Sequence, residues 1–332
     1  MKTSLLMVSF LSVLAACSSA ETRSLHIKVE PERDRVLRSS AGDVIFQVEI
    51  RGRTEKPRQR LPLNLAVVLD RSGSMSGAKL EQAKQAALTV LDQLAPTDYF
   101  SLLAYDDEVQ VLVPARRVEN KERVRSAILA LRAGDSTALY AGVREAAEQV
   151  KRYLSREKIN RVILLSDGLA NVGPSKPSDL ASLGGRLLEE RIHVTTIGLG
   201  DDYNEDLMMA LSEASGANYY YVRDAEKLPG IFREELGNLQ SIVARNIRII
   251  LEMPEGVRPV EVMGHPEVVF KNNRAELVLQ EHYAAQQRGF LIRCEVLKPQ
   301  GKSQELARVT LRYQDEVAGC RARIHAGPTD GR

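Results

Sequence analysis

Two different hydrophobic periods divide this chain, and they limit its fold more than any other feature of the sequence. Between residues 63 and 236, short apolar runs alternate with stretches whose apolar residues recur every three or four positions. The runs at 65–69 and 162–165 have the length and composition of buried strands, and the intervening stretches have the period of amphipathic helices. This alternation predicts an α/β domain with a mainly parallel sheet flanked by helices.

The flanking segments 24–60 and 246–325 contain runs in which apolar and polar residues alternate strictly. Residues 25–29 are one such run and residues 307–313 are another. Strands of this type bury one face and leave the other in water. Because the two ends of a domain often lie close together, we predict that both segments combine into a smaller β-sandwich, with the α/β domain inserted between them.

The balance of charge argues against a nucleic-acid partner. The 332 residues include 46 Lys and Arg and 44 Asp and Glu, which leaves a formal net charge of +2. Nucleic-acid binding usually requires a clustered basic excess. Trp is absent and aromatic residues make up only 5% of the chain, so platforms on which bases could stack are not expected either.

The first 16 residues have the layout of a secretory signal. Lys2 is followed by a mostly apolar stretch over residues 5–16. This stretch is too short to cross a bilayer core of ~30 Å as a helix. A charged start, a short apolar middle and small residues at the end are typical of a segment that is removed after export.

The end of this segment resembles the bacterial lipobox. Residues 14–17 read Leu-Ala-Ala-Cys, and in a lipobox the cysteine is lipidated and becomes the first mature residue. The resemblance implies a signal peptide over residues 1–16, lipidation of Cys17 and a tether over residues 17–23. It also implies that Ser18 favours the outer membrane. We therefore expect a lipoprotein of the bacterial cell envelope that faces the periplasm, held by acyl chains rather than by a spanning helix.

Export changes how the remaining cysteines are interpreted. With Cys17 lipidated, Cys294 and Cys320 form an even pair in an oxidising compartment, where a disulfide can form. Two buried free thiols are an equally acceptable interpretation. The sequence does not give the distance between the two Cα atoms on which a disulfide depends, so both alternatives stay open.

Three loops of the α/β domain carry side chains with oxygen donors. The first loop contains Asp70, Ser72 and Ser74, the second contains Thr137, and the third contains Asp167. Loops that follow the carboxyl ends of parallel strands open on one edge of the sheet. Two carboxylates and three hydroxyls, without imidazole or thiolate, suit Mg²⁺, Mn²⁺ or Ca²⁺ rather than Zn²⁺. The sequence predicts a site for one divalent cation.

This order of residues resembles the metal-ion-dependent adhesion site (MIDAS) of von Willebrand factor type A (VWA) domains. That motif reads Asp-x-Ser-x-Ser, then a Thr, then an Asp, and all five positions are filled within residues 63–236. The resemblance implies a Rossmann-like fold. It also implies direct metal ligands at Ser72, Ser74 and Thr137, with Asp70 and Asp167 acting largely through water.

By the same resemblance, one metal position stays open for an Asp or Glu carboxylate of a protein partner. The site would then bind without catalysing, so we expect an adhesion or scaffold protein and not an enzyme. Two other functions stay open: a structural envelope protein whose metal only stiffens the loops, and a metal-dependent hydrolase. A nucleotide-dependent enzyme is disfavoured because neither Gly-x-Gly-x-x-Gly nor the complete loop Gly-x-x-x-x-Gly-Lys-Ser/Thr occurs.

Local alternatives exist for several of these residues. Ser72 and Ser74 could only cap the following helix, although capping requires neither of the other two loops. The acidic pairs at 106–107 and 201–202 could bind a further cation, but polar turns are the more frequent role of such pairs. The five histidines are scattered without zinc spacing.

Overall fold

The structure is a computed structural model in which the chain forms two compact units. Residues 1–58 and 242–332 make up one unit, and residues 59–241 the other. The described residues are 23–31, 42–54, 60–134, 136–168, 170, 172–201, 203–265, 267–297 and 306–326. The expected signal peptide and Cys17 lie outside these ranges.

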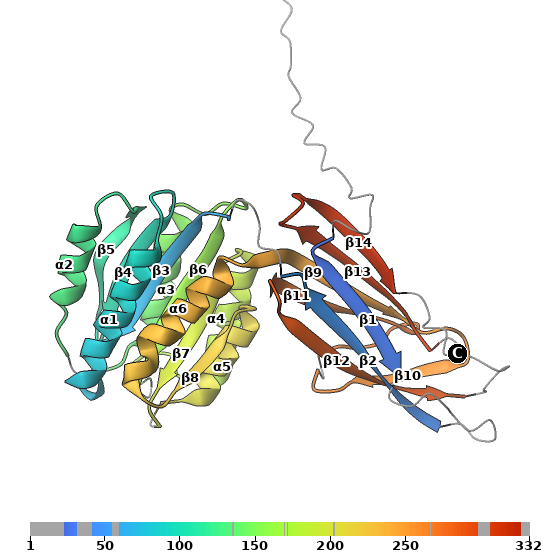
Figure 1. Cartoon of the computed structure of the whole chain (residues 1–332). Coiled ribbons are helices and arrows are strands. Elements are labelled where there is room, and N and C mark those ends of the chain that lie inside the picture. The colour runs from blue at the N-terminus through green and yellow to red at the C-terminus, as the bar shows by residue number, and fades with distance from the viewer. Residues whose placement is uncertain are drawn as a thin grey trace, which may run out of the picture. The chain divides into compact units, whose positions relative to one another are not determined.

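The unit of residues 59–241 is built on a six-stranded sheet with the order β5-β4-β3-β6-β7-β8 (Figure 1). Its strands are β3 (Leu63–Asp70), β4 (Tyr99–Tyr105), β5 (Val109–Arg117), β6 (Ile159–Ser166), β7 (His193–Leu199) and β8 (Tyr219–Val222). All neighbours pair in parallel except β4 and β5, which are antiparallel. Every residue of the central strands β3 and β6 is buried, as expected where helices cover both faces of a sheet.

Helices pack on both faces of this sheet (Figure 1). They are α1 (Ala78–Gln93), α2 (Lys121–Leu129), α3 (Leu139–Lys151), α4 (Pro177–Glu189), α5 (Glu205–Ala214) and α6 (Leu228–Leu239), with short 3₁₀ turns η2 (Gly73–Met75) and η3 (Ala225–Lys227). Helices α3, α4 and α5 share one apolar core with β3 and β6, whereas α1 and α6 pack against each other. The predicted α/β fold class is confirmed.

The other unit consists of two antiparallel four-stranded sheets, with the orders β1-β2-β12-β10 and β11-β9-β13-β14. The strands are β1 (Leu25–Pro31), β2 (Gly42–Gly52), β9 (Ile242–Glu252), β10 (Val257–Val262), β11 (Arg274–Tyr283), β12 (Gln287–Val296), β13 (Arg308–Asp315) and β14 (Cys320–Ala326). Strand β2 pairs with β12, in a register that places Phe46 opposite Ile292. Side chains of both sheets, among them Phe46, Ile249 and Leu311, meet in one core. The predicted β-sandwich of N-terminal and C-terminal strands is confirmed.

Cys294 is a free thiol inside the sandwich. Cys294 belongs to β12 of the first sheet, whereas Cys320 begins β14 of the second sheet. The disulfide alternative for Cys294 and Cys320 is wrong, because the Cys294 thiol is free. The alternative of two free thiols is wrong as well, because Cys320 is not a free thiol. The Cys294 thiol donates to the Val44 carbonyl oxygen at 3.5 Å, and burial raises its pKa to about 11.

His282 is a buried titratable residue of the sandwich whose pKa makes the stability of that unit depend on pH. Its side chain in β11 is fully buried, and Nε2 lies 3.1 Å from the Gln286 carbonyl oxygen. Burial, helped by the charge of Arg288, lowers its pKa to about 4. The unfolded chain, whose histidine pKa is about 6.5, takes up the proton first as the pH falls. The stability that His282 contributes is fully present above about pH 6.5, the pKa of the unfolded chain, and is lost between about pH 6.5 and pH 4.

We expect His282 to lower the free energy of unfolding of the sandwich by about 2 kcal/mol between about pH 7 and pH 5. Urea titrations at both pH values measure this difference. His282→Leu removes the titrating group, so the variant should lose this share of the pH dependence. A pH dependence of the same size in both proteins would contradict the assignment.

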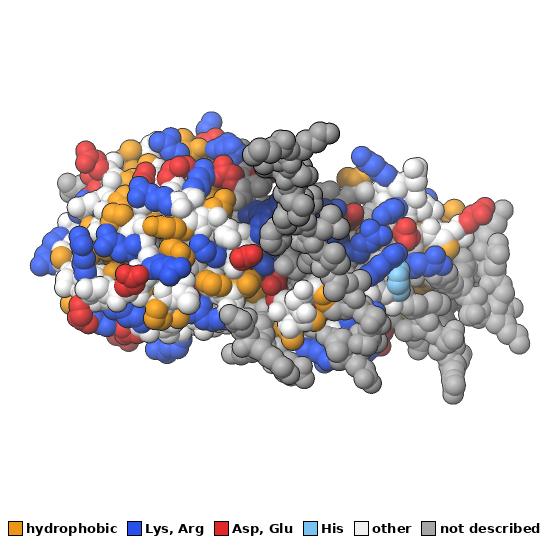
Figure 2. Space-filling model, turned by 90° about the horizontal axis from the view of Figure 1, so that it is seen from above, with side chains coloured by type: hydrophobic (Ala, Val, Ile, Leu, Met, Phe, Trp, Pro, Cys, Tyr) orange, Lys and Arg blue, Asp and Glu red, His pale blue; other side chains and the backbone are white. Residues whose placement is uncertain are grey.

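Figure 2 shows how the types of side chain are distributed on one face of the α/β unit. On the face drawn in Figure 2, Lys and Arg side chains are interspersed with acidic and apolar ones. This pattern follows from the nearly balanced composition of the chain.

Candidate metal centre

The first loop of the site leaves the sheet at the carboxyl end of β3. Asp70 is the last residue of that strand, and its Oδ1 accepts a hydrogen bond from the backbone N–H of Ser72 at 2.8 Å. The turn η2 follows, and its Met75 side chain is fully buried. Gly77 then takes a positive φ of 75° and precedes α1, a conformation that favours glycine. The loop is held at both ends, so its serines have a defined position.

Three hydroxyl groups border a common space beside Gly168. A Cβ atom built on Gly168 would lie 3.5 Å from Ser74 Oγ, 3.5 Å from Thr137 Oγ1 and 4.0 Å from Ser72 Oγ. The two serine hydroxyls are 3.1 Å apart. Because glycine has no side chain, this space is left to whatever the three oxygens bind. The structure therefore brings the three loops together.

Two buried carboxylates stand next to the hydroxyls. Asp70 Oδ2 accepts hydrogen bonds from Ser166 Oγ at 2.7 Å and from the Tyr105 hydroxyl at 3.2 Å. Burial raises the pKa of Asp70, while the hydrogen bonds from Ser72 and Ser166 oppose the rise. Asp167 is also buried. Hydrogen bonds of this kind orient carboxylates beside a metal ion.

Lys79 is a residue of the site that the sequence interpretation missed. Its ammonium group lies 2.5 Å from Asp167 Oδ2, while Asp167 Oδ1 accepts a hydrogen bond from Ser74 Oγ at 2.7 Å. The lysine comes from the first turn of α1, and its side chain is 34% exposed. Cations are disfavoured at a helix N-terminus. A lysine in the first turn of a predicted helix is therefore unexpected, and this feature of the sequence could have predicted an acidic partner for Lys79.

Arg71 and Asp106 hold the Thr137 loop beside the Asp70 loop through one ion pair and two backbone hydrogen bonds. Arg71 lies 2.7 Å from Asp106 Oδ2, the Gly134 N–H donates to the Arg71 carbonyl oxygen at 2.6 Å, and the Ala138 N–H donates to the Asp106 carbonyl oxygen at 2.7 Å. Asp106 is therefore engaged in joining two loops, which supports the turn interpretation of the acidic pair at 106–107.

The other candidates from the sequence lie elsewhere or have other contacts. Helix α1 has Gly77 at its N-cap, and Ser72 makes no side-chain capping bond, so the interpretation of the two serines as helix caps is wrong. Asp201 accepts a hydrogen bond from the Tyr221 hydroxyl, and Asp202 lies outside the described residues. The role of the five predicted residues as metal ligands stays a prediction.

The donor chemistry of the site fits a hard divalent cation. Within the described ranges, no group of three or more His, Cys, Asp or Glu side chains gathers around a point, so this centre depends on its hydroxyls. Three hydroxyl oxygens with two carboxylates beside them are ligands that Mg²⁺, Mn²⁺ and Ca²⁺ accept. The absence of sulfur and imidazole donors argues against a zinc centre of the structural type.

A parallel sheet with helices on both faces and oxygen donors at its carboxyl edge defines a Rossmann-like α/β domain with a candidate cation centre. Residues 64–234 match the family model of the von Willebrand factor type A domain. The chain belongs to this family, as the resemblance of its motif implied. Domains of the family are often metal-dependent modules for protein interaction.

Curated relatives match with modest identity. The uncharacterized protein sll0103 of Synechocystis sp. is 26% identical over 284 residues, which are 82% of this chain and 67% of that protein. The uncharacterized protein YfbK of Escherichia coli is 25% identical over 67% of this chain and 39% of its own length. Human inter-alpha-trypsin inhibitor heavy chain H4 is 29% identical over 47% of this chain, but the match is only 18% of that protein.

Two solved structures resemble most of the chain. A von Willebrand factor type A protein from Catenulispora acidiphila has a TM-score of 0.70 at 19% identity, and the match covers 95% of this chain and 76% of that chain. The ArnB paralog VWA2 from Sulfolobus acidocaldarius has a TM-score of 0.58 at 20% identity, with coverages of 91% and 74%. Identities this low show a shared fold only.

Proposed function

We propose that this chain is a metal-dependent protein-binding lipoprotein of the bacterial cell envelope, of the adhesion or scaffold type. One divalent cation, Mg²⁺ or else Mn²⁺ or Ca²⁺, binds at the predicted MIDAS. A protein partner supplies an Asp or Glu carboxylate to it. The observation that carries the proposal is the convergence of three hydroxyl oxygens, two from the Asp70 loop and one from the Thr137 loop, within 4.0 Å of one point beside Gly168.

Each residue of the site has a separate task in this proposal. Ser72 and Ser74 present oxygen ligands from the loop before α1, and Thr137 presents a third from the loop before α3. Asp70 and Asp167 are held by hydrogen bonds from Ser166 Oγ and Ser74 Oγ and orient the hydroxyls and bound water. When bound, the cation supplies a positive centre that a carboxylate oxygen can approach.

Lys79 adds a second positive group beside this centre. Its ammonium already neutralises Asp167, so a partner carboxylate approaching the site meets less repulsion from the protein's own carboxylates. The side chain is one-third exposed and is within reach of an incoming acidic residue. Lys79 therefore helps to select an acidic side chain of the partner.

The arrangement around the site favours binding over catalysis. Ser166 is the serine next to Asp167, but it is fully buried and its hydroxyl donates to Asp70. A nucleophile needs both access to a substrate and a neighbouring base. The buried hydroxyl lacks that access, so it acts as a support for Asp70.

Partner capture tests the proposal directly. Immobilised protein is incubated with an envelope extract in Mg²⁺ and then eluted with EDTA. We expect the same partner to bind wild type, to elute with EDTA and to be lost from Thr137→Ala. Ser76→Ala serves as the matched control because Ser76 is exposed in the same loop region.

Capture that persists in EDTA and in Thr137→Ala would contradict the proposed mechanism. If Mg²⁺ raises the melting temperature while no partner binds in a metal-dependent way, the metal has only a stabilising role. That outcome would favour the structural envelope protein over the binding protein.

Anchoring through Cys17 is the second part of the proposal. It is supported by the lipobox-like sequence at 14–17. No helix in the described part of the chain is long and apolar enough to cross a membrane. Acyl chains stabilise membrane residence by ~0.8 kcal/mol per buried methylene. We expect wild type in the membrane fraction and Cys17→Ala in the soluble fraction of a bacterial host, and equal membrane fractions for both would reject a lipid anchor.

A further inference from the structure

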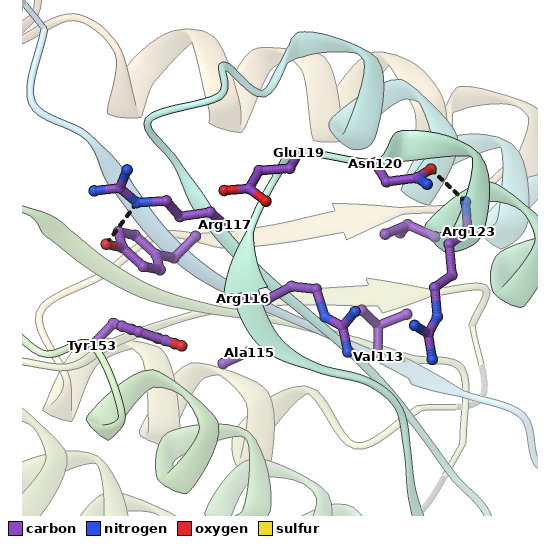
Figure 3. A pocket seen from close by; sticks show the side chains of 10 residues that line it. Val113, Ala115, Arg116, Arg117, Glu119, Asn120, Arg123 and Tyr153 are labelled. Carbon is purple, nitrogen blue, oxygen red and sulfur yellow. Dashed lines mark hydrogen bonds between the residues drawn. The ribbon is translucent and has the colours of Figure 1, made fainter.

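A pocket with a volume of about 560 Å³ opens beside the edge strand β5 of the α/β unit (Figure 3). This volume is in the range of sites that take small molecules. The residues that shape it come from β4, β5, the segment after α3 and the start of α2. The polar and aromatic ones used below are Tyr99, Arg116, Arg117, Glu119, Arg123 and Tyr153.

Two arginines of the pocket have no partner for their charge. Figure 3 shows the guanidinium groups of Arg116 and Arg123 extending toward each other beside Val113. Neither group has a hydrogen bond or ion pair with the part of the chain that the structure describes. By contrast, Arg125, on the same helix as Arg123, is paired with Asp92 at 2.7 Å. The two unpaired groups are the ones that face the pocket.

The lining as a whole is cationic. Its charged residues are Arg116, Arg117, Arg123 and Glu119, so three positive charges against one negative charge leave two positive charges. Arg117 is partly engaged, because its Nε donates to the Tyr99 hydroxyl at 3.0 Å. That hydrogen bond, with the charge of the nearby Lys158, lowers the pKa of Tyr99, which reflects the positive potential at this edge.

Two tyrosine rings in tilted contact form another part of the lining. The ring centroids of Tyr99 and Tyr153 are 4.3 Å apart, and Lys158 Nζ lies 3.9 Å from the centre of the Tyr99 ring. Tyr153 remains partly exposed. A partly exposed aromatic ring in the same pocket as two guanidinium groups can pack against the ring of a ligand while the ligand's charged group is bound.

The edge of the sheet is closed to strand addition at this point. The Ala115 N–H donates to Gln149 Oε1 at 3.1 Å, and the preceding residue is Pro114, which has no N–H to donate. An extended peptide therefore cannot continue the ladder along β5 here. A ligand of this pocket is therefore recognised by side chains rather than by the β5 backbone, which favours a compact molecule over an extended peptide.

The pocket lies at the opposite end of the sheet from the candidate metal centre. Tyr99 begins β4 and pairs with Asn64 at the start of β3, whereas Tyr105 ends β4 and pairs with Asp70. The two ends are about 20 Å apart for strands of this length. A ligand in the pocket therefore leaves the metal centre free.

We propose that this pocket is a binding site for a phosphate monoester on a ring-bearing compound such as a sugar phosphate. The guanidinium forks of Arg116 and Arg123 match the geometry of phosphate oxygens. A dianion neutralises the two surplus positive charges of the lining, whereas a single carboxylate leaves one. The sugar ring packs against Tyr153.

Binding of defined probes tests this assignment. Glucose 1-phosphate, inorganic phosphate and glucuronate are titrated into the full chain at low ionic strength, with affinity measured by calorimetry. We expect glucose 1-phosphate to bind about tenfold more tightly than glucuronate, which offers a similar ring with one carboxylate. We expect Arg116→Gln and Arg123→Gln each to weaken glucose 1-phosphate binding about tenfold.

Arg125→Gln is the matched control, because it removes an arginine of the same helix that is already paired with Asp92. It should leave the affinity unchanged. Unchanged binding in Arg116→Gln and Arg123→Gln overturns the proposal, as does glucuronate binding as tight as that of glucose 1-phosphate. Mn²⁺ binding by the same variants reports that they are folded and is expected to match wild type.

The same phosphate group also occurs on lipids, and vesicles distinguish the two sources. Phosphatidylcholine vesicles with phosphatidic acid display a phosphate monoester on a membrane surface. Binding to these vesicles that is lost in Arg116→Gln and Arg123→Gln supports the site with a lipid as the source. Binding of glucose 1-phosphate without binding to these vesicles supports the site with a soluble sugar phosphate as its ligand.

Discussion

Replacing Ser72 and Ser74 together by alanine is expected to weaken Mn²⁺ binding by at least about a hundredfold, because loss of even an indirect contact around a metal costs ten- to a hundredfold. The double variant removes two of the three hydroxyl oxygens that meet beside Gly168. Calorimetric titration of EDTA-treated protein with Mn²⁺ gives the affinity.

The control for this experiment is Ser76→Ala, at an exposed serine close to the same loop. It removes a hydroxyl of the same kind and is expected to bind Mn²⁺ as wild type does. The far-UV circular dichroism of both variants should match wild type, since neither serine caps α1. Equal Mn²⁺ affinity in the double variant and in wild type would mean that the cation, if it binds, binds elsewhere.

Replacing Glu235 by alanine is expected to destabilise the α/β unit by about 3–5 kcal/mol, because it removes the common acceptor of three hydrogen bonds inside the unit. Glu235 of α6 is fully buried. It accepts hydrogen bonds from Thr195 Oγ1 at 2.5 Å, Asn218 Nδ2 at 2.8 Å and the Tyr220 hydroxyl at 2.9 Å. The buried Arg161 donates to the same Thr195 oxygen at 3.3 Å, so one substitution affects the whole network.

Urea unfolding followed by the helical circular dichroism signal measures this loss, since the chain has no Trp to report by fluorescence. Glu234→Ala is the matched control, because Glu234 precedes Glu235 in α6 and is exposed. It should change the free energy of unfolding by no more than about 0.5 kcal/mol. Similar free energies of unfolding for Glu235→Ala and Glu234→Ala would show that the buried network does not fix α6 to the sheet.

Much of the α/β fold could be predicted because its central strands are continuous apolar runs. Strands β3 and β6 are neighbours in the sheet, and Leu69 pairs with Leu165. That pairing places Asp70 and Asp167 at the same edge, as expected for loops at the carboxyl ends of adjacent parallel strands. The convergence of these two residues therefore follows from local sequence pattern and one topological rule.

Other features of the site depend on contacts between distant segments and could not be predicted in this way. The Thr137 loop is placed by Arg71 and Asp106, which meet only after β3 and β4 have paired. Lys79 was missed because a lysine on a helix surface is usually exposed to solvent, and its ion pair with Asp167 depends on the third loop.

Helix α2 was also absent from the expected elements. Only Val124 and Ile128 of this helix are buried, so its apolar stripe is too narrow to stand out as a period. Arg123 of α2 and Arg116 of β5 contribute to the pocket, which is why that pocket was not foreseen. No pattern in the sequence indicates that two arginines from different elements lie in the same pocket.

The insertion of one unit within the other imposes an order on synthesis. The α/β unit is continuous over residues 59–241, so its strands are all available before the later part of the chain is made. Strand β2 has only β1 to pair with until β12 (Gln287–Val296) has emerged. A lone two-stranded hairpin is marginally stable in water, and its unpaired edge invites contact with other chains. The sandwich is thus the late-maturing part of the molecule, and the interval before β12 arrives is when a nascent chain most needs a chaperone.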